Sequence, residues 1–360
     1  MSRSPRVLFV PVSSAEGIGE YMRSVILADA ISSRWKDAEI HFVLSRQAPY
    51  SSQCPYPVTL VDKSPTKEVK AVNTLMAQFK PDLVIFDASG RKSQLQCAHQ
   101  LGAKVIFISQ HKRKRSRGLK IGRARVTDSH WVVQPEFVIG PISVIDRFKL
   151  QLIGKPEPIF TGPVFTNPDA QRQFGLLQNY GLSAGEYAIF NAGSGGHKVA
   201  DLLAADIFSE VARNCYRTHG IKSLMVFGPN YPKDIPQYEG VISVAAMSNA
   251  EFINLLAAAK VAVISGGDTL LQAIALKVPT LTAPVSKDQP ARIAACEKEQ
   301  LVMACPTNPE AMSQALGRML QPENLSQLKQ RLLSAPALNG LQVGMEEIIR
   351  LLEKYPEVQS

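Results

Sequence analysis

The chain has 360 residues, of which 45% are hydrophobic, and its formal net charge is +9 at pH 7. This length predicts two domains rather than one core, and the apolar content is typical of a globular protein. No window approaches the roughly 18 uncharged apolar residues of a membrane span, and the N-terminal apolar run is too short for a signal peptide, so we expect neither.

The N-terminal half alternates short apolar stretches with helix-like stretches. Strands are predicted at residues 7–12, 40–44, 58–61, 83–86, 105–109 and 131–133, and helices at 19–34, 66–79 and 92–101. This alternation favours a parallel sheet covered by helices on both faces. The proline-containing segment 154–164 is predicted to connect a first domain, residues 1–158, to a second.

The C-terminal half repeats this pattern. Strands are predicted at residues 187–191, 224–227, 241–244, 261–264, 280–283 and 301–303, and helices at 199–218, 249–259, 269–276, 289–299 and 310–320. They define a second α/β domain, residues 165–340. A last amphipathic stretch, 343–354 within the tail 341–360, is a candidate to cross back onto the first domain.

The most informative stretch is residues 261–295. Its apolar run at 261–264 ends in the sequence SGGDT and opens into a helical pattern. A helix N-terminus attracts anions, and two glycines let a phosphate approach the backbone. The next strand ends near Asp288 and Gln289, so the sequence predicts a diphosphate site with two polar side chains close by. An ordinary strand-to-helix turn is the alternative.

This stretch resembles the nucleotide-sugar signature of GT-B glycosyltransferases, in particular the membrane-associated GlcNAc transferase of peptidoglycan synthesis and its relatives. The matching residues are Gly266, Gly267, Thr269, Pro279, Pro284, Asp288 and Gln289. Three positions depart from the family pattern. Gln272 replaces the glutamate that binds the ribose hydroxyls, Lys277 replaces a glycine, and Arg292 replaces an asparagine.

A second glycine-rich loop, NAGSGGHK at 191–198, resembles the donor-domain loop of the same superfamily and is predicted to precede a helix directly. A plain turn is again the alternative. The loop at 246–249 resembles, more weakly, the one that contacts the base through backbone atoms. The residues expected to bind the donor are Gly193, Ser194, Gly195, Gly196, Lys198, Met247, Gly266, Gly267, Asp268, Thr269, Gln272, Asp288 and Gln289.

In the first domain, residues 13–23 resemble the GxGHxxR loop of nucleotide-sugar transferases and of the UDP-sugar hydrolase of pseudaminic acid synthesis. Gly17, Gly19 and Arg23 match, and the resemblance assigns them to the acceptor or membrane side. Glu20 stands where the family has histidine. A carboxylate there can act as the base that deprotonates an acceptor hydroxyl, although a simple first-turn helix residue is the alternative.

Two further residues are candidates for catalysis. Asp87 ends a predicted strand and is expected either to support the base or to cap the helix after Ser89. His111 ends the next strand and is the nearest substitute for the family histidine, with an ordinary surface histidine as the alternative.

A basic run carries almost all of the excess charge. Eight cations and no acid fall within residues 112–125: Lys112, Arg113, Lys114, Arg115, Arg117, Lys120, Arg123 and Arg125. The run can bind an anionic acceptor, such as a phosphorylated sugar or lipid diphosphate, or an anionic membrane. It contains no aromatic residue for stacking, so we expect no nucleic-acid partner. A solvated flexible loop is the alternative.

Together these patterns predict an α/β protein of the GT-B class, with two Rossmann-like domains facing a central cleft. The resemblance implies an inverting hexosyltransferase that uses a UDP or dTDP sugar, an anionic or lipid-linked acceptor, and no metal or cofactor. Five scattered cysteines without metal-ligand spacing favour the cytoplasm, with peripheral binding to the inner membrane face and a cell-envelope role as a further expectation. A nucleotide-sugar hydrolase or epimerase and a degenerate binding protein remain open.

Overall fold

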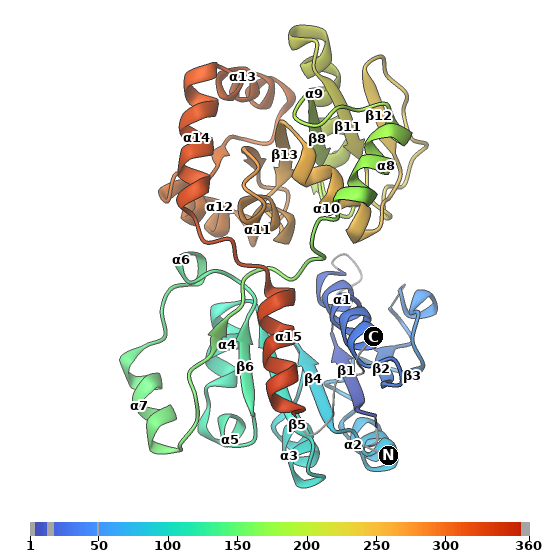
Figure 1. Cartoon of the computed structure of the whole chain (residues 1–360), viewed down its shortest axis with the longest axis vertical. Helices are drawn as coiled ribbons and strands as arrows, with labels where there is room; N and C mark the ends of the chain where they lie inside the picture. Colours follow the sequence, from blue (N-terminus) through green and yellow to red (C-terminus); the bar gives the residue numbers. More distant parts are fainter. Residues whose placement is uncertain (1–3, 13–17, 49, 354–360) are drawn as a thin grey trace. The chain divides into compact units, whose positions relative to one another are not determined.

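The computed structural model describes residues 4–12, 18–48 and 50–353, so Gly17 lies outside the described residues. The chain divides into two compact units: Met1–Val164 with Gly340–Ser360, and Phe165–Asn339. Each unit is a parallel sheet with helices packed against it (Figure 1).

The sheet of the first unit has seven parallel strands in the order β3-β2-β1-β4-β5-β6-β7. They are β1 (Arg6–Pro11), β2 (Glu39–Ser45), β3 (Val58–Val61), β4 (Leu83–Asp87), β5 (Lys104–Ser109), β6 (Ser129–Val132) and β7 (Ile159–Phe160). All six strands predicted for this half are present. The seventh, β7, falls in the predicted connector, where Ile159 pairs with Trp131 of β6.

Helices cover both faces of this sheet, as its apolar strands require. They are α1 (Gly19–Arg34), α2 (Val69–Phe79), α3 (Lys92–Gln100), α4 (Lys112–Gly118), α5 (Ile121–Ala124), α6 (Glu136–Ile139), α7 (Val144–Leu152) and α15 (Gly340–Leu351), with a 3-10 turn η1 (Ser51–Gln53). On one face, Phe9 and Ile85 pack with residues of α1 and α15. On the other, Val84 and Phe86 pack with residues of α2 and α3. Figure 1 shows α15 and α1 near each other, and the two helices are in contact.

The basic run does not form a flexible loop. Residues 112–118 form α4 and residues 121–124 form α5, so the loop alternative is wrong. The reason is that two small residues of this segment, Gly118 and Ala124, are buried together with Leu119. A side chain at Gly118 would come within 2.7 Å of the Phe107 ring, so the helix approaches β5 closely.

The sheet of the second unit has six parallel strands in the order β12-β11-β8-β13-β14-β15. The strands are β8 (Tyr187–Asn191), β11 (Lys222–Val226), β12 (Val241–Val244), β13 (Val261–Ser265), β14 (Thr280–Ala283) and β15 (Met303–Ala304), beside a small hairpin of β9 (Lys198–Val199) and β10 (Leu202–Leu203). The helices are α8 (Ala170–Tyr180), α9 (Ala204–His219), α10 (Asn249–Ala258), α11 (Asp268–Ala275), α12 (Gln289–Lys298), α13 (Pro309–Met319) and α14 (Pro322–Ser334).

One helix prediction in this half needs correction. The helix expected from residue 199 begins at Ala204, because the hairpin of β9 and β10 occupies residues 198–203. The glycine-rich loop after β8 therefore leads into a hairpin rather than directly into a helix. Helices α8 and α14 were not predicted.

Both sheets reverse their strand order once. The chain runs outward from β1 to β3 and then resumes at β4 on the other side of β1, and it does the same from β8 to β12 and then β13. In open α/β sheets, ligands bind outside the carboxyl ends of the two strands that flank such a reversal. The topology therefore marks two places: the loops after β1 and β4, and the loops after β8 and β13.

Candidate functional site

In the second unit, the loops after β8 and β13 lie against each other. A Cβ atom at Gly193 would lie 3.5 Å from the hydroxyl of Ser265. The loop after β8 is tightly folded: Gly195 has φ of +93°, and a Cβ there would come within 2.6 Å of the carbonyl oxygen of Phe227. Asn191 braces it, since its Oδ1 accepts from the backbone N–H of Gly193 at 3.0 Å and its Nδ2 donates to the carbonyl of Val226 at 2.9 Å.

The turn after β13 has the form expected of an anion site. Helix α11 begins at Asp268 directly after Gly267, which has no side chain to cap it. A Cβ at Gly267 would have no neighbour closer than 3.9 Å, so there is space in front of this turn. A Cβ at Gly266 would instead lie 2.7 Å from the Ile293 side chain, so a larger residue here would force that side chain to shift. The first turn of α11 can therefore present backbone N–H groups to an anion.

Two side chains of α12 fix this turn from behind. The Oε1 of buried Gln289 accepts from the backbone N–H of Gly266 at 3.1 Å and of Val285 at 2.8 Å. Buried Arg292 donates from Nη1 to the carbonyl of Gly266 at 2.6 Å and pairs with Asp268 at 3.5 Å. Gln289, which was predicted to bind the donor, thus has its Oε1 engaged by two backbone N–H groups next to the turn. Sequence reasoning noted Arg292 only as a departure and missed this bracing.

The remaining residues that were predicted to bind the donor differ in how exposed they are. Gln272 is 9% exposed on α11, and Thr269 is half-buried in the first turn of that helix. Asp288 is exposed and its Oδ1 accepts from Ser286 at 2.7 Å. Lys198 is exposed in β9. The other predicted residues vary in burial: Ser194 and Met247 are half-buried and Gly196 is exposed.

In the first unit, a hydrogen-bonded chain joins the ends of β4 and β5 to α1. The guanidinium of Arg23 donates from Nε and Nη2 to the two oxygens of Asp87, both at 2.8 Å, and these side chains are 5% and 0% exposed. Arg23 Nη2 also donates to Gln110 Oε1 at 3.2 Å. Gln110 Nε2 in turn donates to Oε1 of Glu20 at 3.0 Å.

The predicted catalytic residues differ in their surroundings within this hydrogen-bond network. Both oxygens of Asp87 accept from Arg23 inside the protein. The alternative that Asp87 caps the helix after Ser89 is wrong, because Arg91 is the N-cap of α3. The half-buried Glu20 lies in the first turn of α1. His111 is exposed, 3.4 Å from Gln110 between Nε2 atoms.

The structure places Arg23 in the interior of the first unit and joins it to Gln110. Arg23 was expected on the acceptor or membrane side, together with Gly19, which is exposed at the start of α1. Arg23 is 4% exposed and donates hydrogen bonds to Asp87 and Gln110. Gln110 was not predicted at all, although its place directly after β5, at the same sheet edge as Asp87, is a signal that could have identified it.

The predicted basic residues are also divided by the structure. Arg115 is 8% exposed and donates to the carbonyls of Gly140 and, at 3.0 Å, Pro141, so it holds the segment before α7. Lys112 and Arg113 are exposed. Lys114 and Arg117 line a pocket together with further cations.

No helix among the described residues combines the length and the apolar character needed to cross a bilayer. In the same part of the chain, no group of three or more His, Cys, Asp or Glu could hold a metal ion.

No protein-family model matches the chain, and no curated protein matches it in sequence. Solved structures do match it. The spinosyn forosaminyltransferase SpnP is 14% identical and has a TM-score of 0.64, and the match covers 97% of this chain and 100% of the SpnP chain. The glycosyltransferase VinC in complex with dTDP is 15% identical over 97% and 100%, with a TM-score of 0.60. S. aureus MnaA with UDP is 13% identical over 99% of each chain, with a TM-score of 0.59.

These matches, with the two parallel sheets, show that the chain has the GT-B fold of two Rossmann-like domains. At this level of identity the likeness concerns the fold, and function has to be argued from the site.

Proposed function

We propose that the protein is a glycosyltransferase that moves a sugar from a UDP or dTDP sugar to an anionic acceptor. The observation that carries the proposal is the pair of loops at the strand reversal of the second unit. There the glycine loop after β8 lies against the glycine turn that opens α11. Backbone N–H groups and a helix dipole at such a place are suited to a diphosphate.

In this proposal the diphosphate binds at Gly266–Thr269 and at the loop Gly193–Gly196. Lys198 supplies a point charge to a phosphate. Gln272 hydrogen-bonds the ribose, and Asp288 and the backbone near Met247 lie toward the sugar or the base. Gln289 and Arg292 support the site by fixing Gly266. The leaving nucleoside diphosphate gains negative charge as the glycosidic bond breaks, and the N-terminus of α11 stabilises it.

The first unit supplies the base in the same proposal. Glu20 accepts the proton of the acceptor hydroxyl while the hydroxyl oxygen attacks the anomeric carbon, which inverts its configuration. The chain from Asp87 through Arg23 and Gln110 orients the Glu20 carboxylate. His111, at the other side of Gln110, is the substitute base if Glu20 has no such role.

A nucleotide-sugar epimerase or hydrolase is the second candidate, because the structural matches include a putative UDP-N-acetylglucosamine 2-epimerase from Listeria monocytogenes with a TM-score of 0.59. An epimerase changes the donor sugar without releasing it to an acceptor, and a hydrolase transfers it to water. A catalytically inactive binding protein would retain the donor without turnover. Product analysis separates all three from a transferase.

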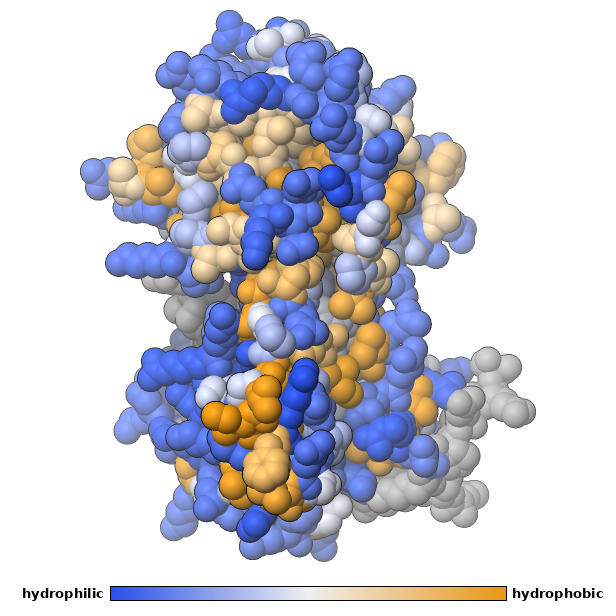
Figure 2. All heavy atoms as spheres, turned by 90° about the vertical axis from the view of Figure 1, so that its left-hand side faces the viewer, coloured by the Kyte–Doolittle hydropathy of each residue, from blue (hydrophilic) through white to orange (hydrophobic). Residues whose placement is uncertain are grey.

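Binding to an anionic membrane is a further part of the proposal, for a lipid-linked acceptor. Helix α7 exposes Val144 (79%), Ile145 (67%), Phe148 (59%) and Leu152 (68%). Figure 2 shows these apolar side chains gathered over α7 with hydrophilic residues around them. Such a face next to cations suits the interface of an anionic bilayer. In a flotation experiment, wild-type protein should float with anionic vesicles, and the variant with Phe148 and Leu152 changed to serine should not. If this variant still floats, membrane binding through α7 is excluded.

The test of the main proposal is a thermal-shift screen with nucleotides and nucleotide sugars, followed by product analysis. A ligand at a hundred times its dissociation constant should stabilise the fold by about 2.7 kcal/mol. We expect UDP or dTDP, and their sugars, to stabilise the protein, and transfer to require an anionic acceptor. If no nucleoside diphosphate or nucleotide sugar binds, the proposal fails.

A further inference from the structure

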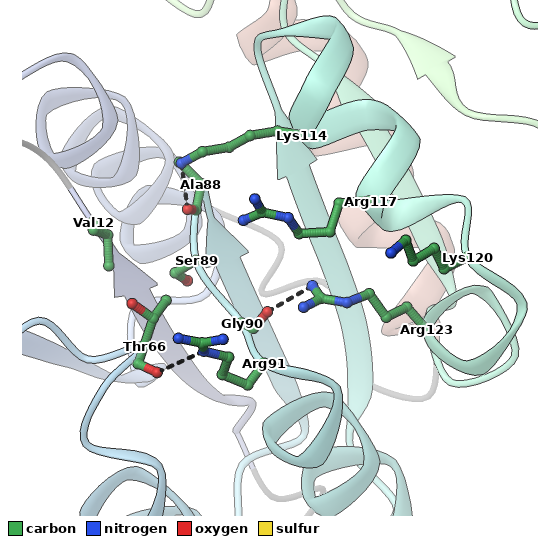
Figure 3. Close-up of a pocket in the computed structure, with 10 residues that line it drawn as sticks. All are labelled: Val12, Thr66, Ala88, Ser89, Gly90, Arg91, Lys114, Arg117, Lys120 and Arg123. Atoms are coloured by element: carbon green, nitrogen blue, oxygen red, sulfur yellow. Dashed lines mark hydrogen bonds between the residues drawn. The ribbon is translucent and has the colours of Figure 1, made fainter.

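A basic pocket of about 470 Å³ opens in the first unit, outside the residues assigned above to the donor and the base. It lies at the strand reversal of the first sheet, since its walls come from the carboxyl ends of β1 and β4 and from α4 and α5 (Figure 3). Its lining residues are Val12, Thr66, Ala88, Ser89, Gly90, Arg91, Lys114, Arg117, Lys120 and Arg123. Five of the ten are cations and none is acidic, and the volume is in the range of sites for small molecules.

Three of the cations are held in place by backbone carbonyl oxygens. Lys114 Nζ donates to Ala88 at 2.6 Å, Arg123 Nη1 donates to Gly90 at 2.7 Å, and Arg91 Nε donates to Thr66 at 3.1 Å. Each of these side chains has further N–H groups. Their positions are therefore fixed before a ligand arrives, which lowers the entropy cost of binding.

The cations are close enough to repel one another. Burial lowers the pKa of Arg123, and the charges of Arg117 and Arg91 lower it further. Burial also lowers the pKa of Lys114, where Arg117 and Arg23 add to the effect and Glu20 and Asp87 oppose it. An anion in the pocket would relieve this repulsion, and folding alone gains nothing from it.

The backbone at the floor of the pocket also offers donors. Ala88 and Gly90 have φ of +52° and +81°, and a Cβ at Gly90 would come within 2.7 Å of Leu95 Cδ1. Within the described residues, the backbone N–H groups of Ser89 and Gly90 have no hydrogen-bond partner. In Figure 3 the guanidinium of Arg117 points toward this loop.

We propose that this pocket binds a phosphoryl group of the acceptor substrate. The proposal rests on the proposed function, because it identifies the acceptor as a phosphorylated compound and gives its anionic group a defined place. Lys114 joins the pocket to the region of Glu20, since both Glu20 and Asp87 act electrostatically on its ammonium group. A phosphoryl group bound by Arg117, Lys120 and Arg123 would hold the rest of the acceptor beside Glu20.

Calorimetric titration of the full chain with inorganic pyrophosphate and with glucose 1-phosphate tests the proposal. The test variant is Arg117→Gln with Lys120→Gln, which removes two pocket cations whose side chains make no hydrogen bond to the described residues. The matched control is Arg113→Gln with Arg125→Gln, two exposed cations of the same run that do not line the pocket. Loss of two charge-assisted contacts should weaken binding at least about tenfold in the test variant and less than about twofold in the control. Equal losses in both variants would overturn the pocket in favour of diffuse attraction.

The donor site must be excluded as the place where these anions bind. We expect Gly267→Asp to leave phosphate binding unchanged while it abolishes nucleotide binding. If Gly267→Asp removes both, the anions bind the donor site and the pocket proposal fails while the proposed function stands. If wild-type protein binds no nucleotide, but the pocket variant binds the phosphate compounds more weakly than wild type, the proposed function fails and the anion site remains.

Two sources of the phosphoryl group are separated by a last comparison. If the protein binds soluble glucose 1-phosphate, and the Arg117, Lys120 variant binds it more weakly, the source of the phosphoryl group is a soluble phosphosugar. Binding only to vesicles that contain phosphatidic acid, again reduced in that variant, identifies a lipid phosphate. Binding of neither would overturn the proposal.

Discussion

Arg23 and Asp87 form a doubly hydrogen-bonded ion pair in the interior of the first unit, with both N···O distances at 2.8 Å. The side chains are 5% and 0% exposed, so the pair is shielded from water. A buried pair adds little net stability compared with apolar residues, because both charges lose their hydration. Its value here is positional, since the same guanidinium also fixes Gln110 and, through it, Glu20.

The first prediction concerns this pair. Asp87→Asn leaves the Arg23 charge buried without a carboxylate, and we expect a loss of about 3–5 kcal/mol of stability. The double variant Arg23→Met with Asp87→Leu removes both charges and should lose much less. Urea denaturation at pH 7 measures both. If the single variant is as stable as wild type, the pair does not have the buried geometry described here.

The fold could be predicted from the sequence to a large extent because its signals are local. Helix α1 and strands β3, β8, β12 and β14 have the bounds expected from apolar runs and their flanking residues. Strand β7 could not be found in this way, because two residues carry no periodicity and depend on pairing with β6. Short helices such as α6 are missed for the same reason.

Of the candidate site, the sequence indicates the backbone turns but not the side-chain contacts that hold them. Glycine turns at the ends of β8 and β13 are visible in sequence, whereas the roles of Gln289 and Arg292 depend on contacts across more than twenty residues. Burial also decides what a charge can do. Nothing in the sequence distinguishes Arg115, which is 8% exposed and bonds the backbone, from the exposed Arg113 two positions earlier.

The second prediction tests the base. Glu20→Gln keeps the shape of the side chain and the contact with Gln110 but removes the group that accepts a proton. We expect turnover to fall by about 10²–10⁴ while donor affinity is unchanged. Asp37→Asn, a change of an exposed carboxylate in the same unit, is the control and should keep full activity. Full activity of Glu20→Gln would move the role of base to His111.

The third prediction tests the donor turn. Gly267→Asp places a negative charge at the N-terminus of α11, where a Cβ has no neighbour closer than 3.9 Å. The variant should therefore fold normally and lose affinity for nucleoside diphosphates, because the carboxylate repels the diphosphate. Gly175→Asp on α8, where a Cβ meets nothing within 4 Å, is a matched control that should bind normally. Equal nucleotide affinity of both variants would place the donor elsewhere.

The fourth prediction concerns pH. His130 is buried, 2.9 Å from the Ser109 hydroxyl, and burial, with a smaller effect of Arg115, lowers its pKa from 6.5 to about 3. The unfolded chain binds this proton below pH 6.5 and the folded chain does not. Its contribution to stability is therefore complete above pH 6.5 and falls as the pH decreases toward 3, by up to about 1.4 kcal/mol per pH unit. His130→Gln should reduce this slope in urea denaturation between pH 6.5 and 4, whatever its effect at pH 7. An identical slope would show that His130 does not titrate in this way.

The fifth prediction concerns Lys277, which stands where the resembled family has glycine. Its φ of +63° is left-handed, a conformation that costs a residue with a Cβ about 1–2 kcal/mol, and its Nζ donates to the carbonyl of Ala335. Lys277→Ala loses the hydrogen bond and keeps the strain, whereas Lys277→Gly loses the hydrogen bond and relieves the strain. We therefore expect the glycine variant to be more stable than the alanine variant by about 1 kcal/mol in urea denaturation, although neither contains the side-chain bond. If alanine is the more stable of the two, the backbone at residue 277 is not left-handed in solution, and the departure from glycine at this position needs no structural compensation.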